Sequence, residues 1–323
     1  MIPRAVEERW NRYWFPNAPL ADLAILRIIA VGTQLVLMLL DERYGLKSLV
    51  EISKLPAFMY EPMLFLKLLT TAMGGYKFIL HDMQIMWFVT VAAGLFSLIG
   101  LWTRVMLLVF AAGVSVMQLW VMSHGDAHHP EAAMMLALCT LALAPSGATF
   151  SVDWWIRRRR DSRPARSQLL EMSREAKWPL LLLQWIFALM YLSAAYAKIV
   201  YGHGHWANGY TLQFYLARDG LRWDSLLGVW LSHYHWLSFF SQWAILIFQS
   251  TFVVSMFVPK LKYIYVPIGM AMHIGIYLML EAPFFQWSAL YLVFVPWTSI
   301  ILEARRAIRG GAEPQFVLEG RRV

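Results

Sequence analysis

Long apolar segments limit what this chain can fold into. A helix needs about 20 mostly apolar residues to cross a bilayer, and eight segments of the sequence qualify or nearly qualify. They are residues 20–40, 84–102, 105–122, 131–147, 178–199, 236–258, 263–281 and 284–302. Charged residues make up only 15% of the chain, against about 25% in soluble domains. The sequence therefore predicts an all-α, polytopic membrane helix bundle of about eight transmembrane helices.

The first predicted span is preceded by a polar, tryptophan-rich stretch without a small-residue cleavage site, which favours a retained first helix over a signal peptide. A ninth apolar stretch, 55–72, contains two prolines, Glu61 and Lys67, and we expect an interfacial or re-entrant segment there. The single cysteine, Cys139, excludes an intramolecular disulfide.

Basic residues gather in five of the segments between and around the spans. With eight spans, 19 of the 28 Lys and Arg fall on one side, and the positive-inside rule identifies that side as cytoplasmic. The predicted layout is a cytoplasmic N-terminal segment (1–19), a transmembrane domain (20–303) and a cytoplasmic basic tail (304–323). The basic run 157–166 lacks interleaved aromatic residues and is interpreted as a topological anchor, not a nucleic-acid site.

Histidines gather on the opposite, outer side, which holds eight of the nine under this topology. The eight are His81, His124, His128, His129, His203, His205, His233 and His235. Three interpretations compete: enrichment at the membrane interface, a metal site, or an outward-facing active site. The H-x-H spacings suit metal ligands, but there is no HExxH pattern and no cysteine partner, so we predict no metal.

Lys198 ends the fifth span and stands on one helical stripe with Gln184, Phe187, Tyr191 and Ala194. The lysine either snorkels to the headgroups or faces a polar cavity. In an apolar pocket the neutral amine is favoured, and the lysine becomes a candidate general base.

Three other ionisable residues lie in or next to the predicted spans. Lys260 and Lys262 are predicted to lie in a water-exposed cytoplasmic turn, and so not to take part in chemistry. His273 lies within a span, which indicates either function or an interhelical hydrogen bond.

The run YLSAAYAKIVYGHGHWANGYTLQFYL, residues 191–216, resembles the lysine segment of the horizontally transferred transmembrane (HTTM) domain. This domain is the membrane part of vitamin K-dependent gamma-carboxylases. The resemblance covers residues 20–303. Its matching positions are Lys198 with Ile199, Trp206, Gly209 and Tyr210, then Arg27, the turn 100–104, His128-His129, Ser151-Val152-Asp153 and His273.

The resemblance implies a chemistry. In the carboxylases a lysine deprotonates reduced vitamin K, and the oxygenated quinol then removes a proton from a glutamate that is carboxylated. Carried over, Lys198 is the base, and His129, with His128 as the alternative, assists the later proton removal. We expect His273, Tyr191, Trp206 and Tyr210 to bind the substrate or the quinone, and the cofactor to be a reduced naphthoquinone.

Two classes of function remain open. The first is quinol-dependent oxygenation or carboxylation at the outer face. The second is a non-enzymatic quinone- or lipid-binding protein acting as an accessory, processing or immunity subunit. The carboxylases carry a large further domain, whereas this sequence has about twenty residues after the last span. We therefore expect a separate substrate-binding protein or peptide substrate as partner, beside the bilayer of a bacterial cytoplasmic membrane. No inverted repeat favours a transporter.

Overall fold

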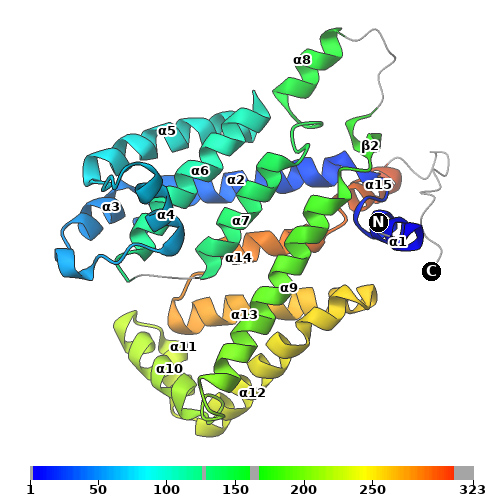
Figure 1. The fold of residues 1–323 in the computed structure, drawn as a ribbon. Coiled ribbons are helices and arrows are strands. Elements are labelled where there is room, and N and C mark those ends of the chain that lie inside the picture. The colour runs from blue at the N-terminus through cyan, green and yellow to red at the C-terminus, as the bar shows by residue number, and fades with distance from the viewer. Residues whose placement is uncertain (1–2, 126–128, 161–166, 309–323) are drawn as a thin grey trace.

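The computed structural model describes residues 3–125, 129–160 and 167–308, and these fold into packed helices (Figure 1). The α-helices in chain order are α1 (Arg4–Trp14), α2 (Leu20–Leu40), α3 (Leu46–Ser53), α4 (Leu64–Ala72), α5 (Leu80–Ile99), α6 (Thr103–Met122), α7 (His129–Leu143), α8 (Val152–Arg160), α9 (Lys177–Val200), α10 (Tyr210–Arg222), α11 (Leu226–Ser232), α12 (His235–Thr251), α13 (Lys262–Leu280), α14 (Phe285–Leu290) and α15 (Trp297–Ile308).

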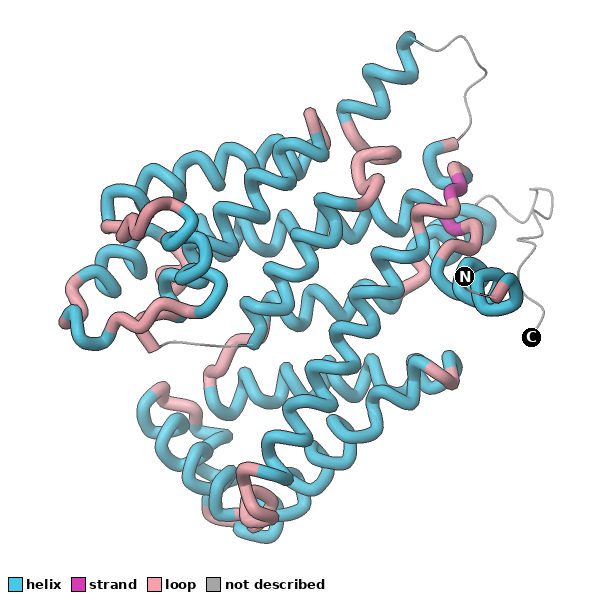
Figure 2. The backbone as a smooth tube through the Cα atoms, viewed as in Figure 1, coloured by secondary structure: helices cyan, strands magenta, loops and turns pink. Residues whose placement is uncertain are grey.

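Short 3-10 helices and one strand pair complete the described structure. The 3-10 helices are η1 (Ala57–Met59), η2 (Gln168–Leu170), η3 (Phe252–Met256), η4 (Pro259–Leu261) and η5 (Tyr291–Phe294). Strand β1 (Ala18–Pro19) pairs antiparallel with β2 (Met172–Ser173), next to the start of α9 (Figure 2). This pair joins the beginnings of α2 and α9, which are far apart in the sequence.

Six of the described helices are long and apolar enough to cross a membrane, so the chain is a multi-pass membrane protein. They are α2, α5, α6, α9, α12 extended by η3, and α13 extended by η4. A seventh candidate is the pair Phe285–Phe294 and Trp297–Ile308, which is bent by 70°. The count of eight full-length spans is thus not reproduced among the described residues, because the segments 131–147 and 284–302 form shorter or broken helices.

Burial explains why α7 can be short. Its 15 residues extend about 22 Å, less than the ~30 Å hydrocarbon core. The helix contacts α2, α6, α9 and α14, and Met134, Ala137, Leu138 and Leu141 are completely buried. Most of α7 is therefore packed against protein, while Leu136 and Leu143 stay exposed. The enclosed part of the helix does not have to match the thickness of the lipid.

Two sets of polar contacts lie at one end of the bundle, in the first half of α2. There the Arg27 guanidinium, fully buried on α2, donates to the carbonyls of Ser146 (3.0 Å) and Phe150 (2.6 Å). The Asp22 carboxylate accepts from the backbone and hydroxyl of Thr298 (2.7 Å each). These contacts place the start of α15 and the segment before α8 beside the start of α2 (Figure 1).

The opposite end carries the shorter elements. Residues 55–72 form η1, an extended stretch and α4, as expected of a segment that does not span. Glu61 and Met63 donate their backbone N–H groups to Ser123 at the end of α6 (2.8 and 3.0 Å). We also predict a non-helical loop over 199–210, and residues 201–209 form this loop between α9 and α10.

Candidate functional site

The stripe predicted on α9 faces the interior of the bundle. Gln184, Phe187 and Tyr191 are buried, and Ala194 and Lys198 are half-buried. The Lys198 amine donates to the Ala194 carbonyl one turn earlier, at 3.3 Å, and lies 5.1 Å from the centre of the Trp206 ring. No described carboxylate forms an ion pair with this amine.

The loop after α9 holds Trp206 beside the lysine. The Gln242 side chain on α12 donates to the Trp206 carbonyl (2.5 Å) and accepts from the Gly209 backbone (2.6 Å). Gly209 has φ of +88°, and a Cβ at this position would come within 2.6 Å of the His235 ring. The ring of Tyr210 packs against the same histidine, with 4.2 Å between centroids. Only glycine therefore fits the turn that delivers Trp206.

A second polar group lies deeper, around Tyr191. Its hydroxyl is 2.8 Å from His273 Nε2 on α13, and it accepts from the Trp287 indole at 2.8 Å. It also hydrogen-bonds the hydroxyl of Tyr291. Phe187 packs over Trp287 with 4.2 Å between centroids. The interhelical bond considered for His273 is thus formed, within a closely packed aromatic cluster.

The two groups share α9 but not a direct contact. Tyr191 and Lys198 are seven residues apart, about 10 Å along the same helix face. The described contacts pair Tyr191 with His273, and Lys198 with Trp206. His128 lies outside the described residues. His129 begins α7, but its side chain is outside what the structure describes, so a convergence of Lys198, His129 and His273 stays a prediction.

A third buried polar group was not anticipated from the sequence. The Glu131 carboxylate, 6% exposed, accepts from the Tyr44 hydroxyl at 2.6 Å. The Gln286 side chain also hydrogen-bonds Tyr44. Burial, the nearby Glu131 charge and the hydrogen bond to it raise the pKa of Tyr44 well above its ordinary value. Glu131 therefore bonds Tyr44, and the described residues show no ion pair between Glu131 and Lys198.

The expectation for the two other lysines is corrected in part. Lys260 is exposed, as predicted. Lys262 is half-buried, and its amine donates to the Gln184 side chain at 2.8 Å. Gln184 in turn donates to the Val293 carbonyl at 3.0 Å. Lys262 thus reaches α9 through its hydrogen bond to Gln184, a contact that the sequence of the turn does not reveal.

The described part of the chain holds no group of three His, Cys, Asp or Glu side chains arranged to bind a metal ion. No family model, curated protein or solved structure matches the chain.

Proposed function

We propose that this is a membrane protein of the HTTM type, in which Lys198 acts as a general base on a reduced naphthoquinone at the outer face of a bacterial cytoplasmic membrane. The base abstracts a phenolic proton, and oxygen is the oxidant in the reaction that the family resemblance implies. The observation that carries the proposal is the environment of Lys198: a half-buried amine without a described carboxylate partner, beside an indole face.

The side chains around Lys198 fit a quinol ring better than those around Tyr191 do. Beside Lys198, the indole of Trp206 offers a flat surface for stacking, and the amine is close enough to reach a phenol placed on it. Around Tyr191 the hydroxyl is already bonded to three partners. We therefore assign Lys198 and Trp206 to the ring, while Tyr191 and His273 hold α9 against α13 and α14.

Replacing Lys198 by arginine distinguishes a lysine that accepts a proton from one that only carries a charge. An arginine does not deprotonate in proteins and cannot replace a lysine that must accept a proton. A lysine that only carries a positive charge can be replaced by arginine. This difference separates the catalytic role from snorkelling.

The test is oxygen uptake by purified protein supplied with reduced naphthoquinone. We expect both Lys198→Ala and Lys198→Arg to abolish quinol-dependent uptake, and Lys260→Ala, an exposed lysine on the described structure, to leave it unchanged. Full activity in Lys198→Arg would eliminate the general-base role. Quinone binding, measured separately by equilibrium dialysis, should persist in both Lys198 variants.

The non-enzymatic alternative makes a different prediction for the same samples. If wild-type protein binds the quinone but consumes no oxygen, the protein is a quinone- or lipid-binding accessory subunit. A partner or peptide substrate would then be sought by its effect on binding instead of on turnover.

A further inference from the structure

A cavity of about 840 Å³ opens where α2 ends, between α2, α13 and α14. Its lining residues are Thr33, Val36, Leu37, Leu40, Asp41, Glu42, Arg43, Trp223, Tyr277, Glu281 and Phe285. Its lining combines apolar side chains of α2, aromatic rings and, on what we call its rim, the charged groups Asp41, Glu42, Arg43 and Glu281. Its volume is within the ~300–1,000 Å³ range of ligand pockets. We call it the α2–α13 groove.

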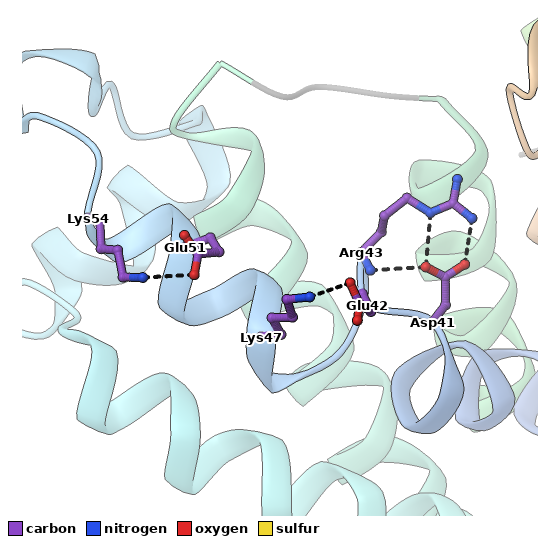
Figure 3. A network of polar contacts seen from close by, with 6 residues as sticks. All are labelled: Asp41, Glu42, Arg43, Lys47, Glu51 and Lys54. Atoms are coloured by element: carbon purple, nitrogen blue, oxygen red, sulfur yellow. Dashed lines mark hydrogen bonds and ion pairs between the residues drawn. The ribbon is translucent and has the colours of Figure 1, made fainter. Parts of the chain in front are cut away.

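Most charges on the rim are already neutralised within the chain. Arg43 donates two hydrogen bonds to the Asp41 carboxylate, from Nε at 2.9 Å and from Nη2 at 2.6 Å. Lys47 pairs with Glu42 at 2.5 Å, and Figure 3 shows both pairs side by side. Bonding to Arg43, which outweighs partial burial, lowers the pKa of Asp41 and keeps it charged.

Glu281 differs from these acids. It follows α13 in the left-handed region, with φ of +47°, and no described basic side chain forms an ion pair with it. After internal pairing, the rim therefore retains the negative charge of Glu281. Tyr277 lies one helical turn before Glu281, and its ring packs against Phe285 with 5.5 Å between centroids. Aromatic faces beside a carboxylate attract ammonium groups.

The α2 side of the groove has the length and polarity for an alkyl chain. Thr33 to Leu40 covers about 10 Å of α2. Val36 and Leu40 are 54% and 79% exposed, so the apolar side of the groove opens toward the surroundings of the bundle. An occupant thus needs an apolar chain along α2 and a cationic group at its end.

We propose that the α2–α13 groove binds an ammonium-headed lipid of the surrounding bilayer. The ammonium lies against Glu281 and the rings of Trp223, Tyr277 and Phe285, and the acyl chain follows Val36 and Leu40. Glu281 would repel a lipid with net negative charge. Such a lipid would also find no free basic side chain on the rim, because Arg43 is paired with Asp41. The site does not depend on the reaction assigned to Lys198.

The test compares lysophosphatidylethanolamine with lysophosphatidylglycerol of the same chain, added to the full protein in neutral maltoside detergent. Native mass spectrometry counts the lipids retained. We expect the ethanolamine lipid to be retained about fivefold more than the glycerol lipid. Glu281→Gln should remove this preference, and Glu281→Lys should reverse it. Glu51→Gln, an exposed acid paired with Lys54 away from the groove, should preserve it.

A second pair of variants tests the position of the chain. Val36→Trp places a bulky ring on the α2 side of the groove and should lower retention of both lipids about tenfold. Val89→Trp, at a similarly exposed valine on α5, should have no effect. Equal retention of the two lipids by wild type, an unaltered preference in both Glu281 variants, or normal retention in Val36→Trp would each overturn the proposal. Melting temperatures of all variants establish that they are folded.

Discussion

At the scale of single residues, the Tyr44–Glu131 bond shows how one hydroxyl supports a buried charge. Tyr44→Phe removes the one hydrogen bond to the Glu131 carboxylate found among the described residues. Leaving a buried charged group unsatisfied is costly, so we expect the variant to lose about 3 kcal/mol of stability. Thermal unfolding in detergent measures this loss. Tyr76→Phe removes a comparable but exposed bond to Asp82, and should leave the melting temperature unchanged.

The same tyrosine predicts a dependence on alkaline pH. The pKa of Tyr44 is raised in the folded chain above the ordinary value of about 10. Above pH 10 the unfolded chain therefore binds fewer protons than the folded chain, and stability falls by up to ~1.4 kcal/mol per pH unit. The stability difference between wild type and Tyr44→Phe should be constant between pH 7 and pH 10 and shrink above pH 10. A constant difference up to pH 11 would contradict this assignment.

The residue pattern along α9 predicted which side chains face the interior, but it did not predict which residues they contact. The stripe on α9 is buried at Gln184, Phe187 and Tyr191 because helical spacing alone fixes which residues share a face. The partners of Tyr191 include Trp287 and Tyr291, about a hundred residues later. Their contact depends on how α14 docks, and no local pattern in the sequence encodes that docking.

At the scale of helices, α5 and α6 are in close contact through a glycine. A Cβ at Gly113 would overlap the Thr90 hydroxyl on the facing helix. Gly113→Ala must separate the two helices or distort Thr90, and overpacking of this kind costs about 1–3 kcal/mol. Thr90→Ala in the same chain should restore most of the lost melting temperature. Gly32→Ala, where the nearest atom would be 3.6 Å away, is the control.

Asp153 joins α8 to the start of α6. Its carboxylate accepts from the backbone of Trp102 (2.8 Å) and from the backbone and hydroxyl of Thr103 (2.7 Å each). Burial opposes ionisation, but these hydrogen bonds outweigh it and lower the pKa of Asp153. Its contribution is therefore present at neutral pH and is lost as the pH falls below about 4. Asp153→Ala should cost about 1 kcal/mol at pH 7 and little at pH 3, as thermal unfolding at both values would reveal.

At the scale of the whole molecule, the length rule predicted eight spans, and six of them correspond to described helices long and apolar enough to cross a membrane. The predicted segments 20–40 and 178–199 agree with α2 and α9 within one residue at each end. The segments 131–147 and 284–302 became α7 and the bent α14–α15 pair. Both lie against other helices, and a protein environment removes the length requirement that lipid imposes. Composition does not reveal which apolar segment will be enclosed.

The final prediction concerns the path of the chain across the membrane. Residues 124 and 129 flank the outer end of α6 and the start of α7. By residue 153 the chain has returned to the other end of α6, where Asp153 contacts Trp102 and Thr103. Although short, α7 therefore runs the length of α6 in reverse, and we expect it to complete a crossing.

Cysteine labelling tests this crossing directly. In a Cys139→Ser background, His124→Cys should react with a membrane-impermeant maleimide in intact cells. Arg160→Cys should react only after the membrane is opened, because positive-inside segregation places α8 in the cytoplasm. Labelling of both variants in intact cells would mean that α7 turns back within the bilayer. The basic segments would then be divided between two sides, against the positive-inside rule. Opposite accessibility is thus the outcome that we expect.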